Sequence, residues 1–109
     1  MGNKVEHALF VHLKLSTSFP TVQERNDIHD LEEKLIMAFR SSNVGEVDGL
    51  DFGQGQSTLY IYGPNADDLF NTAEPVLRAS KIARGARVRK RFGTADGVNV
   101  RIVEYTLEG

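Results

Sequence analysis

The histidines have the widest chemical range in this chain, because an imidazole can bind a metal ion or transfer a proton near neutral pH. His7 and His12 lie in a segment of alternating apolar residues, so their side chains leave opposite faces of one strand and cannot hold one metal ion. His29 has no second histidine one helical turn away. For each of them, the plain alternative is a ring that faces solvent or makes an ordinary hydrogen bond. We therefore expect no metal site.

Other signatures of catalysis or cofactor binding are incomplete. The absence of cysteine excludes disulfides, thiolate nucleophiles and cysteine-bound zinc. Gly53-Gln-Gly55 leads into a strand instead of opening a helix, and the third glycine of a dinucleotide fingerprint is missing. Asp67 and Asp68 suit the first turn of a helix and lack calcium-loop spacing. No serine lies in a nucleophile elbow. The sequence thus predicts a non-enzymatic protein without a cofactor.

Two local patterns define the first elements of the chain. Residues 7–15 alternate in polarity, which predicts a strand with one face in the core. Thr21-Val-Gln-Glu24 has the spacing of a capping box, so a helix is expected to begin there and to end between Ser41 and Gly45. Its predicted buried stripe consists of Ile28, Leu31, Leu35, Ala38 and Phe39.

The centre of the chain has the pattern of a hairpin. Strands are predicted at about 46–52 and 57–62, joined by the glycine-bearing link 53–55. Gly49 inside the first of these strands indicates a bulge.

A second helix and a second hairpin follow. Asn65 is the predicted N-cap of a helix that runs to about residue 80, and Pro75 is expected to kink or break it. Strands at about 86–92 and 99–107, joined by an Asp96-Gly97 turn, complete the chain.

The order of these elements predicts one α+β domain spanning residues 1–109. The order is βαββαβ with an extra C-terminal strand, which is typical of a ferredoxin-like two-layer sandwich with two helices on one face of an antiparallel sheet. The run Thr58-Leu-Tyr-Ile-Tyr-Gly-Pro-Asn-Ala-Asp67 resembles that of small bacterial domains of this topology whose function is uncharacterised. The resemblance covers about residues 44–93 and implies no activity.

Helices on one face would leave the other face of the sheet open. Alternation places a set of aromatic, basic and polar residues from three strands on that open face. The candidate binding residues are Phe10, His12, Tyr60, Tyr62, Arg87, Arg89 and Arg91, with Lys14 and Thr58 beside them.

Such a face favours a non-enzymatic interaction or regulatory domain, and we expect a homodimer that covers it. One alternative is single-stranded nucleic acid, with bases stacked on the aromatic rings. A second alternative is a small dimeric α+β barrel enzyme in which His12 and Tyr60 transfer protons in a cavity between two copies. The plain alternative is that Tyr60 and Tyr62 shield a small sheet, with the final strand or the chain terminus lying across them.

Charge is unevenly distributed along the chain. Residues 21–74 hold eleven acidic and three basic residues, whereas residues 78–91 hold seven basic residues and no acidic one. Two solvated faces would explain this pattern, and so would self-association or an acidic protein partner for the basic segment. A pI of about 5.9 and the absence of the RNA-recognition sequence motif disfavour nucleic acid.

No stretch approaches the length of about 20 apolar residues that a membrane span requires, and the first residues lack the apolar core of a signal peptide. A cytoplasmic protein without a membrane partner is therefore expected.

Overall fold

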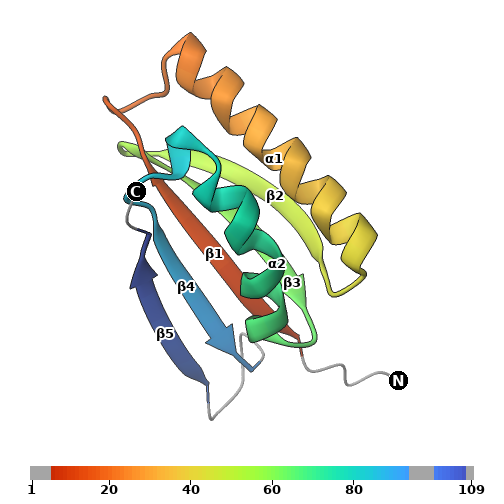
Figure 1. Cartoon of the computed structure of the whole chain (residues 1–109). Coiled ribbons are helices and arrows are strands. Elements are labelled where there is room, and N and C mark those ends of the chain that lie inside the picture. The colour runs from red at the N-terminus through yellow and green to blue at the C-terminus, as the bar shows by residue number, and fades with distance from the viewer. Residues whose placement is uncertain (1–5, 94–99, 108–109) are drawn as a thin grey trace.

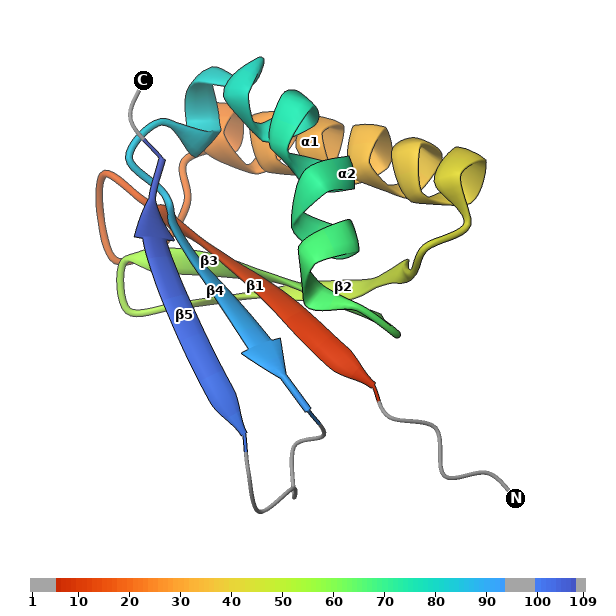
Figure 2. The same cartoon turned by 60° about the horizontal axis from the view of Figure 1, so that its bottom comes forward.

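Five antiparallel strands form one sheet in the order β2-β3-β1-β4-β5. The computed structural model describes residues 6–93 and 100–107. Both helices cover the same face of the sheet (Figures 1 and 2), which confirms the predicted α+β, ferredoxin-like two-layer sandwich with an extra C-terminal strand. The elements are β1 (His7–Lys14), α1 (Val22–Ser42), β2 (Glu46–Gly53), β3 (Gln56–Gly63), α2 (Ala66–Arg78), a short 3₁₀ turn (Lys81–Ala83), β4 (Arg87–Phe92) and β5 (Arg101–Thr106).

Helix α1 begins at the predicted capping box. The Thr21 hydroxyl accepts from the Glu24 amide at 3.0 Å, and the Glu24 carboxylate accepts from the Thr21 amide at 2.9 Å. The helix ends at Ser42, and Asn43 follows in the left-handed conformation that commonly closes a helix.

The core lies between the helices and the sheet. Alternate residues of β1 point toward the helices and are fully buried, as the polarity pattern predicted. Four residues of the predicted α1 stripe meet them there, whereas Ala38 is only half-buried at the margin. The central core side chains are Leu9, Val11, Leu13, Ile28, Leu31, Leu35, Phe39, Leu59 and Ile61.

Helix α2 has two caps at its N-terminus. The Asn65 side chain accepts from the amides of Asp67 and Asp68, as predicted, and His7 Nδ1 accepts from the Ala66 amide at 3.0 Å. Pro75 does not break the helix, which continues to Arg78. Because proline has no N–H, one helical hydrogen bond is missing at Pro75. Only three residues of the helix follow, so the loss does not end it.

The central hairpin has a tight turn at Gln54 and Gly55, both with positive φ, so β2 and β3 extend slightly beyond their predicted ends. The register between these strands shifts between Val47 and Gly49, which confirms the bulge.

Strand β5 pairs with β4 at the edge of the sheet (Figure 1). It therefore does not cross the two tyrosines, and that part of the plain alternative is wrong. The predicted Asp96-Gly97 turn falls outside the described residues. In the part of the chain that the structure describes, neither helix is long and apolar enough to span a membrane.

Candidate functional site

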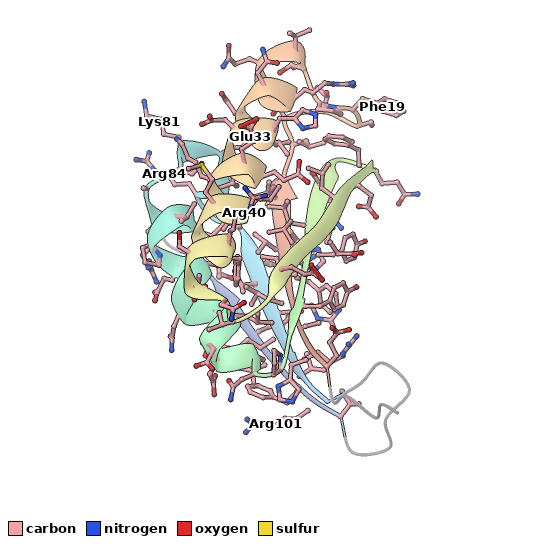
Figure 3. All side chains as sticks on the ribbon, turned by 90° about the vertical axis from the view of Figure 1, so that its right-hand side faces the viewer. Phe19, Glu33, Arg40, Lys81, Arg84 and Arg101 are labelled. Atoms are coloured by element: carbon pink, nitrogen blue, oxygen red, sulfur yellow. The ribbon has the colours of Figure 1, made fainter. Side chains whose placement is uncertain are left out.

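The face of the sheet opposite the helices carries all of the predicted site residues. We call it the open face; in Figure 3 the helices lie on the left and this face on the right. Phe10 of β1 pairs with Tyr60 of β3 on one side and with Arg89 of β4 on the other. Lys90 occupies a core position between two of the arginines, where it is 7% exposed, and this alternation places the arginines on the open face.

Three rings form an aromatic cluster at the centre of the open face: Phe10, Tyr60 and Tyr62. Phe10 contacts both tyrosines edge to face, with ring centroids 5.7 and 6.3 Å apart. The guanidinium carbon of Arg91 lies 5.7 Å from the centroid of the Phe10 ring, a cation–π distance. All three rings are half-buried although no described element covers them. The cluster is therefore held in place within the chain while its outer surface stays accessible.

A polar cluster adjoins these rings around His12. His12 Nδ1 lies 3.0 Å from the Thr58 hydroxyl, its cross-strand neighbour. The Tyr60 hydroxyl donates to the Asp51 carboxylate at 2.7 Å, and this bond raises the pKa of Tyr60. Burial, reinforced by Arg87 and Arg89, lowers the pKa of His12 below its ordinary value of 6.5. His12 is thus a neutral imidazole near pH 7, able to accept a proton.

Two adjoining hollows meet at His12, with volumes of about 570 and 390 Å³. Together we call them the histidine trough. Asp51 and Tyr60 line the larger hollow, and Lys14 and Arg87 line the smaller one. Both volumes fall within the range of small-molecule sites, but the trough is open to solvent on one side. One copy of the chain therefore offers a platform and not a closed pocket.

The three arginines differ in how they are held. Arg89 Nε lies 3.1 Å from a carboxylate oxygen of Glu104 on β5, an ion pair that lacks the alignment of a hydrogen bond. Arg91 donates to the backbone carbonyls of Gly93 and Glu6. Arg87 is exposed and has no ion-pair partner among the described residues. Of the three, Arg87 has the charge most available to an external group.

Two acidic residues of this site were absent from the sequence-based prediction. Asp51 could have been found from the hairpin, since a two-residue turn at Gln54 and Gly55 sets it opposite Thr58. The position of Glu104 opposite Arg89 depends on the register between β4 and β5, which the prediction of a second hairpin does not specify. Among residues 6–93 and 100–107, no group of three His, Asp or Glu side chains is placed to hold a metal ion.

The lowered pKa of His12 predicts a pH-dependent stability. Folded protein binds a proton at His12 less readily than the unfolded chain, so the free energy of unfolding should fall as the pH drops through about 6.5. It should level off below the folded-state pKa. His12→Gln, which keeps a polar group beside Thr58, should lose this slope, and His29→Gln on exposed α1 should retain it. Urea midpoints measured between about pH 5 and 7.5 test this, and equal slopes in both variants would contradict it.

Comparison of the chain with protein-family models, with curated proteins and with solved structures finds no match in any of the three. The resemblance to small bacterial ferredoxin-like domains therefore stays a prediction.

Proposed function

We propose that this protein is a non-enzymatic interaction domain that associates with a second copy of itself through the open face. The single observation that carries the proposal is the aromatic cluster, three rings aligned on a sheet face that no described element covers. Exposed aromatic surfaces of this kind are common at protein interfaces, and two-fold homodimers are the commonest oligomers. Cytoplasmic location is part of the same proposal.

A second candidate function rests on the histidine trough. A neutral His12, bonded to Thr58 and next to Tyr60 and Asp51, is suited to proton transfer if a second copy closes the trough. This is the dimeric α+β barrel enzyme, and it requires the same self-association.

Single-stranded nucleic acid is less well supported as a ligand. Arg91 occupies one side of the Phe10 ring, and Arg89 is neutralised by Glu104. An acidic protein partner would find Arg87 exposed, whereas Arg89 is paired with Glu104 and Arg91 donates to two backbone carbonyls.

Substitution of Phe10 tests the proposed interface. Phe10→Glu should weaken self-association by at least about tenfold, because a central aromatic contact is lost and a charge is buried in its place. The matched control is Met37→Glu on the outer side of α1, where the native side chain is 65% exposed. Sedimentation equilibrium over a range of protein concentrations gives both dissociation constants.

Circular dichroism identifies any variant that fails to fold, and Tyr62→Ser gives a milder change in the same cluster. A wild-type chain that stays monomeric at about 100 µM, well above micromolar dissociation constants, would overturn the proposal. In that case a salt-dependent shift of single-stranded RNA or DNA would favour nucleic acid instead.

A further inference from the structure

The open face has opposite charges along its two sides. Strand β2 contributes the carboxylates of Glu46 and Asp51, while β4 contributes Arg87 and Arg91 at the same two levels of the sheet. The strand pairing defines two rows across the face, Glu46–Tyr62–Ala8–Arg91 and Asp51–Thr58–His12–Arg87. Each row therefore begins with an acid, passes through the central strands and ends with an arginine.

Two copies that stack these faces in a closed homodimer are related by a two-fold axis between the sheets, and the strands of the two copies are aligned when that axis is perpendicular or parallel to them. An axis perpendicular to the strands would place β4 over β4 of the second copy, and the arginines would repel one another. An axis parallel to the strands reverses the strand order instead. If it passes between β1 and β3, β2 of each copy lies over β4 of the other. Each row of one copy then lies over the same row of the other copy.

We infer that the partner of the open face is a second copy related by a two-fold axis that runs parallel to β1, between β1 and β3. This inference rests on the proposed function and specifies its geometry. The axis then passes through the aromatic cluster, so Phe10 of each copy meets Tyr60 of the other. At the edges, Asp51 faces Arg87 of the second copy, and Glu46 faces Arg91. Charge and aromatic contact thus select the same axis.

The same axis completes the histidine trough. Because levels along the strands are preserved, His12 of one copy lies over Thr58 of the other, and both His12–Thr58 pairs meet across the interface. Face-to-face sheets pack about 10 Å apart, close enough for side chains from both copies to line a shared chamber. The Asp51–Arg87 pairs would stand at its two sides. The platform of a single copy would therefore become an enclosed polar site only in the dimer.

Reversal of the charge at position 87 tests the axis by the sign of its effect. With the inferred axis, Arg87→Glu sets two acids against each other and should weaken self-association by about fivefold at each of two symmetric contacts. With the perpendicular axis the same change relieves repulsion and should strengthen it. Asp51→Arg should also weaken association, and the double variant Asp51→Arg/Arg87→Glu should restore it to within about twofold of wild type. Sedimentation equilibrium at low salt measures all four proteins.

Glu33→Arg serves as the control for charge reversal, since this exposed residue lies on α1 (Figure 3). Its dissociation constant should stay close to that of wild type. If Phe10→Glu disrupts the dimer but Arg87→Glu strengthens it or leaves it unchanged, the axis is wrong and the proposed interface stands. If the wild-type chain is monomeric, or Phe10→Glu leaves the dimer intact, the open face is not the interface and the axis is overturned with it.

Discussion

Replacement of Gly63 by alanine should lower the free energy of unfolding by about 2–3 kcal/mol, because the new methyl group would be forced against fixed backbone. A Cβ at this position would lie 2.8 Å from Leu69 Cδ2 and 3.0 Å from the Cα of Gly45, and it would also collide with the carbonyl oxygen of Val44. A leucine side chain can rotate away, but the Val44 carbonyl and the Gly45 Cα move only with the backbone that leads into β2. Urea unfolding followed by circular dichroism measures the loss.

Gly49→Ala is the matched control, since a Cβ there would meet no described atom within 4 Å. Its φ is not in the left-handed region, so alanine should be neutral or slightly stabilising by restricting the unfolded chain. Gly45→Ala should resemble Gly63→Ala, because its Cβ would lie 2.6 Å from the carbonyl oxygen of Tyr62. Equal urea midpoints for Gly63→Ala and Gly49→Ala would contradict the prediction, because they would show that the backbone at Val44 and Gly45 can shift to make room for the methyl group.

The contact between Gly45 and Gly63 could be predicted only in part from the sequence. The second strand of the central hairpin was predicted to end at about residue 62, and β3 ends at Gly63. Gly63 approaches Gly45 because the two residues lie one step beyond the Glu46–Tyr62 pair of the central hairpin. The register shift between Val47 and Gly49, whose size the turn does not specify, sets that pairing. By contrast, the capping box of α1 and the Asn65 cap were predictable because their partners lie within three residues.

The residues on the open face were predictable for a similar reason. A strand has a period of two residues, so each strand divides its own side chains between the two faces without reference to its neighbours. What joins those residues depends on register. The hydrogen bond between His12 and Thr58 spans 46 residues, and the Arg89–Glu104 pair depends on the register between β4 and β5. The composition of the site was therefore accessible from the sequence, and its internal contacts were not.

Lys90 is a charged residue at a core position of β4, where the alternation of a strand predicts an apolar side chain. Its Nζ donates to Asp67 at 2.7 Å and lies 5.1 Å from the ring centroid of Phe70 and 4.9 Å from that of Tyr105. Burial alone would lower the pKa of Lys90, but Asp67 and Tyr105 together raise it. The ammonium group thus remains charged next to the rings of Phe70 and Tyr105, which are stacked with their centroids 5.2 Å apart.

Lys90→Ala should cost about 2–3 kcal/mol of stability, because it leaves a cavity under stacked rings and removes their cation. Lys90→Met retains most of the volume and should cost less than about 1.5 kcal/mol. Its former partner Asp67 has a side chain that is 57% exposed, so water can solvate the carboxylate that is left unpaired. Urea midpoints for the two variants, measured at pH 7, separate packing from charge. If Lys90→Met is as costly as Lys90→Ala, the cation itself holds β4 and β5 to the N-terminal end of α2, and the packing explanation is wrong.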